Sequence, residues 1–210
     1  MKLVQRRKNI NPQREFIIDS SGAPAVKFND NKYIGVLPIT RYQFERFIWK
    51  TAPDWCHYKR PLNASIPFSP LNLRLEHITY LFMTGLNAEE ANLYAEYFGT
   101  RIPSLKEWDC AYETLFVKND LIFEALRFMK MQNEVKEDNR VLKLLEGIHR
   151  LGLVRSELNT KISEMVFEFT EKPFGEIYLK ISDRESGQVL GPNAQKIKCE
   201  KSGFSVVLKE

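Results

Sequence analysis

The chain has 210 residues, of which 43% are hydrophobic and 12% aromatic, so it is long and apolar enough to bury one substantial core. Its 31 basic and 27 acidic residues leave a net charge of +4, too small an imbalance to indicate a nucleic-acid binder by itself. No apolar run is long enough to span a membrane, and none follows the basic start as it would in a signal peptide. We expect one cytoplasmic domain over residues 1–210, without membrane contact.

Short strands followed by a capped helix are predicted at the start of the chain. Apolar runs alternate there with turn-forming residues, which predicts antiparallel strands at Glu15–Asp19, Ala25–Phe28 and Tyr33–Val36. Thr40 then begins a helix, because Gln43 stands at the spacing of a capping box. The helical period places three apolar residues on its inner face: Phe44, Phe47 and Ile48.

The stretch from Thr51 to Pro70 combines prolines with aromatic residues, which predicts a long loop packed on the body by aromatic anchors. Aromatic and arginine side chains supply most of the binding energy at protein interfaces. We therefore choose four residues of this loop as the candidate partner-binding site: Trp55, His57, Tyr58 and Arg60. For Trp55, simple anchoring to the core is an equal alternative.

Two helices and the turn between them are predicted between Gly85 and Trp108. Each helix starts with a pair of residues at capping-box spacing, Asn87 with Glu90 and Ser104 with Glu107. Gly99 fits the left-handed position that ends the first helix, and Pro103 favours an extended approach to the second.

A helical hairpin is predicted over residues 119–152. Apolar residues recur at helical spacing before and after the polar run 134–140, at Leu121, Ile122, Ala125, Leu126 and Met129, and again at Val141, Leu144, Leu145 and Ile148. Strands are predicted after it, at Met165–Phe169, Glu176–Ile181, Gln188–Leu190 and Phe204–Leu208.

Four segments, in chain order, resemble the formylglycine-generating enzyme, or sulfatase-modifying factor, family. The segment 85–108 is similar to the family's Gly-Val-Ser-Trp-x-x-Ala, helix, Gly-x-Arg-Leu-Pro-Thr-x-x-Glu-Trp, matching at Gly85, Ala91, Gly99, Arg101, Pro103, Glu107 and Trp108. The segment 38–44 resembles Glu-Val-Thr-Asn-x-x-Phe, 162–169 resembles Leu-x-Gly-Asn-Val-Trp-Glu-Trp, and 203–207 resembles Gly-Phe-Arg-Leu-Val. The resemblance implies an α+β fold related to C-type lectins, with two main helices, irregular antiparallel sheets and the helical hairpin as an insertion.

The parts of the family pattern that carry chemistry are absent from this sequence. Active members oxidise a peptide cysteine with two nearby copper-binding cysteines, because Cu(I) prefers sulfur ligands. Here Cys199 is the only cysteine after Cys110, so we expect no catalytic residues and no cofactor. The asparagine of the family's calcium block is replaced by Met165, and the arginine of its closing block by Ser205. We give Glu168, which is retained, the role of a buried hydrogen-bond acceptor.

We therefore expect a non-catalytic protein-binding or adaptor module with a protein partner. The resemblance also fits an accessory role in a bacterial regulatory or defence system, CRISPR-associated systems included. Two alternatives remain open, a copper-dependent oxidase with a rearranged site around Cys199, and nucleic-acid association through the basic start, whose cations are Lys2, Arg6, Arg7, Lys8 and Arg14. A zinc site assembled from Cys56, His57, His77 and Cys110 fits no known ligand spacing, so we expect no metal.

Overall fold

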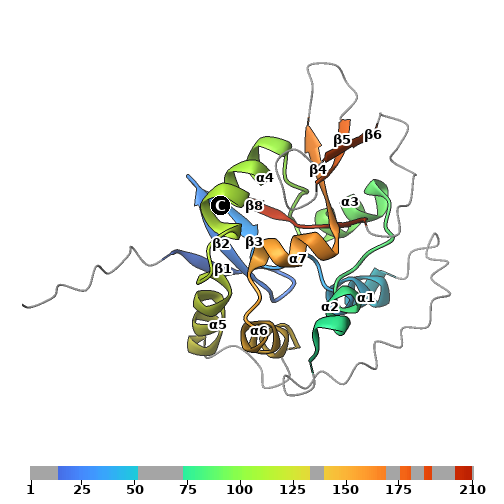
Figure 1. Ribbon diagram of the computed structural model, residues 1–210. Helices are drawn as coiled ribbons and strands as arrows, with labels where there is room; N and C mark the ends of the chain where they lie inside the picture. Colours follow the sequence, from blue (N-terminus) through green and yellow to red (C-terminus); the bar gives the residue numbers. More distant parts are fainter. Residues whose placement is uncertain are drawn as a thin grey trace, which may run out of the picture.

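The computed structural model describes residues 14–51, 73–132, 140–168, 176–180, 187–190 and 202–209. Over these residues the chain is a mixed α+β protein with two small sheets and helices around them (Figure 1). The strands are β1 (Phe16–Ile18), β2 (Pro24–Asn29), β3 (Lys32–Gly35), β4 (Ser163–Glu168), β5 (Glu176–Lys180), β6 (Gly187–Leu190), β7 (Ser202–Phe204) and β8 (Val207–Lys209). The α-helices are α1 (Arg41–Thr51), α2 (Ile78–Leu81), α3 (Ala88–Tyr97), α4 (Leu105–Ala111), α5 (Leu121–Met131), α6 (Arg140–Arg150) and α7 (Arg155–Lys161).

The first sheet is antiparallel in the order β1-β2-β3-β8. Val26 of β2 lies opposite Ile34 of β3, which in turn lies opposite Val207 of β8. These three residues are fully or almost fully buried and share one hydrophobic cluster with α5 and α6. The three strands predicted near the start of the chain are therefore confirmed, with each end shifted by one residue.

The second sheet has the order β6-β5-β4-β7 and contains a parallel pair that the sequence did not predict. Strands β4, β5 and β6 are antiparallel neighbours, while β7 runs parallel to β4 with Met165 opposite Phe204. The single strand predicted at Phe204–Leu208 was wrong, because the chain leaves the second sheet after Phe204 and enters the first sheet at Val207. Gly203 permits this crossing, since a Cβ there would lie 2.8 Å from the carbonyl oxygen of Met83.

The two capped helices predicted on either side of Gly99 are confirmed, including the hydrogen bonds of their capping boxes. Capping boxes begin α3 at Asn87 with Glu90 and α4 at Ser104 with Glu107. Gly99 follows α3 with a φ of 66°, the left-handed conformation that glycine adopts without strain. Because these signals are local, the starts of both helices and the end of α3 can be recognised from neighbouring residues alone.

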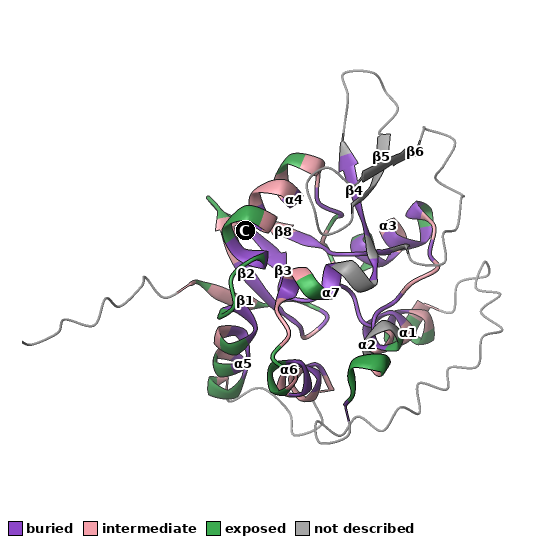
Figure 2. Ribbon diagram, viewed as in Figure 1, coloured by how far each residue is buried: buried purple, intermediate pink, exposed green. Residues whose placement is uncertain are grey.

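The two helices expected between residues 119 and 152 are present as α5 and α6, and they pack against each other. Lys130 pairs with Glu146 at 2.6 Å, and Phe123 contacts the His149 ring at a centroid distance of 5.2 Å. Their inner faces join the cluster beneath the first sheet, while their outer faces are exposed (Figure 2).

A second hydrophobic cluster lies between α1, α3 and the second sheet. Phe44 and Phe47 of α1 pack on Tyr94 of α3, with ring centroids 5.7 and 5.6 Å from it, and Tyr94 also contacts Phe204 of β7. The inner stripe predicted for α1 is confirmed, with Ile48 partly buried against the same cluster. This packing determines which face of α1 points outward.

Candidate functional site

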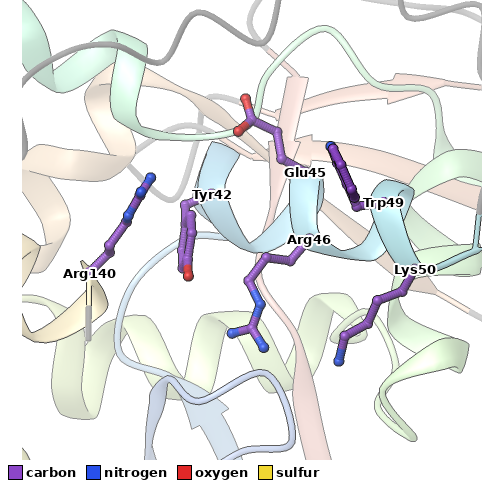
Figure 3. A pocket seen from close by; sticks show the side chains of 6 residues that line it. All are labelled: Tyr42, Glu45, Arg46, Trp49, Lys50 and Arg140. Carbon is purple, nitrogen blue, oxygen red and sulfur yellow. The ribbon is translucent and has the colours of Figure 1, made fainter. Parts of the chain in front are cut away.

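The outward face of α1 carries a stripe of aromatic and charged side chains. Because Phe44 and Phe47 face the core, the residues on the opposite side of the helix are exposed or partly exposed. These are Tyr42, Glu45, Arg46, Trp49 and Lys50, and with Arg140 at the start of α6 they line a hollow of about 320 Å³ (Figure 3). We take this hollow, called the α1–α6 hollow below, as the candidate binding site.

Trp49 is the most exposed large hydrophobic side chain among the described residues, with 80% of its surface accessible. Burying an aromatic side chain of this size contributes substantially to binding, because a large apolar area leaves water. Because so little of its surface is buried, the Trp49 side chain contributes little hydrophobic stabilisation to the fold. It is therefore the residue of the α1–α6 hollow that stands to gain most from a partner.

Two arginines hold the Tyr42 ring. The guanidinium carbon of Arg140 lies 4.8 Å from the ring centroid and that of Arg46 lies 5.7 Å from it, both within cation–π range. Figure 3 shows Arg140 reaching toward Tyr42 from the start of α6. The contact brings two cations to one side of α1 and links the two helices that line the hollow.

Glu45 is the one carboxylate that lines the hollow. Burial raises its pKa above the ordinary value of a glutamate, and the charges of Arg41 and Arg140 oppose that shift. Within the described part of the chain, Arg46, Lys50 and Arg140 are not ion-paired with any carboxylate. The site therefore presents three cations against one carboxylate.

Helix α1 is fixed at its start by a polar network. Thr40 and Gln43 form the predicted capping box, with Thr40 N donating to Gln43 Oε1 at 3.0 Å and Gln43 N donating to Thr40 Oγ1 at 3.2 Å. Gln43 Nε2 then donates to Ser21 Oγ at 2.7 Å, and Ser21 Oγ donates to the buried Asp19. The hollow is thus built on a helix that is tied to the turn between β1 and β2.

A buried charged network lies at the centre of the molecule, away from the hollow. Arg155 and Glu164 are both fully buried and their side chains meet at 2.5 Å. Trp108 Nε1 donates to the other oxygen of Glu164 at 2.8 Å, and Arg155 Nη2 also donates to Ser205 Oγ at 2.8 Å. Burial lowers the pKa of Arg155 and Glu164 opposes that shift, but an arginine pKa is so high that the guanidinium stays charged.

A second ion-pair group joins β3 to the start of α4. Arg101 binds Glu107 through two bonds of 2.6 and 2.5 Å, and Lys32 Nζ and the backbone N of Ser104 each donate to the same carboxylate at 2.9 Å. Burial acts to raise the pKa of Glu107, but these hydrogen bonds outweigh it and lower the pKa to about 2. The group holds the Arg101–Trp108 segment in place.

Lowering the pH should destabilise the protein through Glu107. Its pKa is lower in the folded chain than its ordinary 4.5, so its contribution to stability is complete above that value and is lost as the pH falls toward 2. We expect Glu107→Gln to lower the free energy of unfolding at neutral pH and to flatten its fall between about pH 4.5 and pH 2. Urea unfolding at a series of pH values measures both effects, and an unchanged pH profile in the variant would contradict the assignment.

The predicted partner-binding residues Trp55, His57, Tyr58 and Arg60 lie outside the described residues. They follow α1 closely in sequence, since that helix ends at Thr51. Cys56 and Cys199 also lie outside the described residues, whereas Cys110 is a partly buried free thiol on α4. In the described ranges, no group of three or more His, Cys, Asp or Glu residues is placed to hold a metal ion.

Among the basic residues near the N-terminus, Arg14 is described and is already engaged. Its Nη1 contacts Glu124 Oε2 at 2.6 Å and Asp120 Oδ1 at 2.8 Å. Arg14 therefore ties the residues just before β1 to the start of α5, and its guanidinium already has two carboxylate partners. The other four cations of that alternative lie outside the described residues.

Neither the α1–α6 hollow nor the buried pair of Arg155 and Glu164 was predicted from the sequence. A signal for the first was present, because an inner stripe at Phe44, Phe47 and Ile48 leaves Trp49 on the opposite side of the helix. No signal pointed to the second, since arginine and glutamate are rarely buried and no helix was predicted at Arg155–Lys161.

Comparisons of the chain with protein-family models, with curated proteins and with solved structures found no match. In the part of the chain that the structure describes, no helix is both long and apolar enough to cross a membrane.

Proposed function

We propose that this chain is a non-catalytic protein-binding or adaptor module on a scaffold of the formylglycine-generating-enzyme type, and that the α1–α6 hollow is its contact site. The observation that carries the proposal is Trp49, 80% exposed on α1 in a lining that also contains Arg46 and Arg140. Tryptophan, tyrosine and arginine are the residues most enriched at the energetic centres of protein interfaces. The site contains all three types.

The scaffold part of the proposal is supported by the roles of the residues that match the family pattern. Gly99 ends a helix in the left-handed conformation, Arg101 and Glu107 form a bidentate pair, and Trp108 is fully buried. Each role explains why the residue type is needed at that spacing. The residues that carry the resemblance therefore have identifiable structural roles.

The buried ion pair gives further support at the position where the sequence departs from the pattern. Ser205, between β7 and β8, stands where the family's closing block has arginine, and Arg155 of α7 brings a guanidinium to Ser205 Oγ. Its partner Glu164 stands where the Gly-Asn-Val-Trp block has glycine. The chain thus has a guanidinium near the position of the pattern's arginine but supplies it from α7, which fits a scaffold kept for its shape.

Replacing Trp49 with alanine should remove binding of the partner without unfolding the protein. Truncating a central interface aromatic costs about 2 kcal/mol or more, which is roughly a 30-fold loss of affinity. The measurement is affinity purification of the tagged full chain from its own cells, followed by quantitative mass spectrometry of the retained proteins.

Met131→Ala is the matched control, because Met131 is 66% exposed on α5 and lies outside the residues that line the hollow. It should retain the same proteins as the wild type. If Trp49→Ala retained them as well, the α1–α6 hollow would not be the contact site. If nothing but nucleic acid were retained, the nucleic-acid alternative would replace the proposal.

A further inference from the structure

The chemistry of the α1–α6 hollow is specific enough to identify the kind of segment that would bind there. Three cationic side chains line it against one carboxylate, Glu45. Among the described residues none of these cations forms a close ion pair with a carboxylate, although the charge of Arg140 acts to lower the pKa of Glu45. Placing three positive groups around one hollow costs electrostatic energy that an anionic ligand would recover. The ligand should therefore carry negative charge.

The spacing of the cations favours an extended peptide. Arg46 and Lys50 are four residues apart on α1, so their Cβ atoms are about 5–6 Å apart on the same face. Side chains on one face of an extended peptide repeat at about 6.6 Å. Two acidic residues at alternate positions can thus each face one cation without bending the peptide.

The aromatic residues favour protein over single-stranded nucleic acid. Proteins that bind single strands stack successive bases on several exposed rings. In the hollow the Tyr42 ring is already engaged by Arg46 and Arg140, which leaves Trp49 as the one ring of its lining not engaged by a cation. One exposed ring beside cations suits one apolar side chain within an acidic segment.

From these observations we infer that the α1–α6 hollow binds an extended acidic segment of a protein partner, with carboxylates on Arg46, Lys50 and Arg140 and an apolar side chain on Trp49. The inference rests on the proposed function and adds the class of ligand to it. The guanidinium carbon of Arg46 lies 5.7 Å from the centroid of the Tyr42 ring, and a guanidinium over an aromatic ring can still donate hydrogen bonds in its own plane.

The test is selection from a random peptide library displayed on phage, with the full chain immobilised. We expect the wild-type chain to enrich peptides that have aspartate or glutamate at alternate positions beside an apolar residue. Arg46→Glu/Lys50→Glu should lose these peptides, since reversal turns two attractions into repulsions. The matched control is Lys118→Glu/Arg127→Glu, which changes the net charge equally at two exposed positions outside the hollow.

Fluorescence anisotropy of a labelled selected peptide then gives the size of the effect. Two ion pairs together are worth about 1.4 kcal/mol, so the charge-reversed variant should bind about tenfold more weakly or worse. The same loss is expected for a peptide in which each acidic residue is replaced by its amide. The control variant should bind within about twofold of the wild type.

Three results would overturn the inference. They are selection of peptides without acidic enrichment, equal binding by the charge-reversed variant, and tighter binding of a single-stranded oligonucleotide that is lost on reversal. If any of these occurred while Trp49→Ala still lost its protein partner, the ligand class would be wrong and the proposed function would stand. If Trp49→Ala also kept its partner, both would fail.

Discussion

Replacing Glu164 with glutamine should lower the free energy of unfolding by about 3–5 kcal/mol, because it leaves the fully buried charge of Arg155 without a counter-charge. Arg155→Met should have a similar cost, since it leaves the buried Glu164 carboxylate without a counter-charge and removes one of its hydrogen bonds, while the bond from Trp108 Nε1 is kept. A loss of this size is a large fraction of the stability of an ordinary domain. Urea unfolding followed by circular dichroism measures it.

The double variant Arg155→Met/Glu164→Leu separates the ion pair from its surroundings. Removing both charges together avoids an uncompensated charge, so the double variant should be far more stable than the sum of the single losses predicts. Glu146→Gln is the control, because Glu146 pairs with Lys130 at the surface and should cost about 1 kcal/mol or less. If Glu164→Gln were as mild as that control, the pair would not be buried as described.

Trp108→Ala should destabilise the protein by about 3–5 kcal/mol, the cost of truncating a large buried aromatic residue. The indole is fully buried, stacks on Tyr112 at a centroid distance of 5.1 Å and donates to Glu164. Trp108→Phe keeps a ring in place but loses the hydrogen bond to a charged acceptor, so it should cost about 1.5–3 kcal/mol.

Trp49→Ala is the matched comparison for Trp108→Ala. It makes the same chemical change at a side chain that is 80% exposed, and should alter the free energy of unfolding by about 0.5 kcal/mol or less. The Trp108 variant thus reports on the stability of the fold, and the Trp49 variant reports on partner binding. A result in which Trp49→Ala is the more destabilising of the two would contradict the packing described for both.

Local signals made much of the fold predictable from the sequence. Capping boxes join residues three positions apart, so the starts of α1, α3 and α4 can be recognised without knowledge of the tertiary structure. The alternation of apolar runs with turn-forming residues likewise predicted the positions of β1, β2 and β3. These elements are the ones where local preference and the final structure agree.

Non-local features could not be predicted. Helix α7 was missed because Leu158 is the only apolar residue in Arg155–Lys161, which gives no helical stripe. The division of the last strand into β7 and β8 depends on partners that lie far away in the sequence, on β4 and β3. The burial of Arg155 runs against the ordinary preference of arginine, and only the fold brings Glu164 to it.

The partner-binding site predicted from the sequence is at Trp55, His57, Tyr58 and Arg60, in a predicted loop after α1, whereas the site built from the described residues is on α1 itself. Both choices used the same reasoning, that exposed aromatic and arginine residues carry interface energy. The two choices differ because the helical period of α1 was used only to identify the face that packs on the core. Reading the opposite face as well identifies Tyr42, Arg46 and Trp49 as a stripe.

The most direct test of the account is photo-crosslinking from position 49 in living cells. A photoreactive phenylalanine analogue replaces Trp49 in one version of the full chain and Met131 in the other, both at exposed positions. The account predicts a crosslinked protein partner from position 49 that is absent from position 131. No crosslink from position 49, or the same products from both positions, would contradict the claim that the α1–α6 hollow is a recognition site.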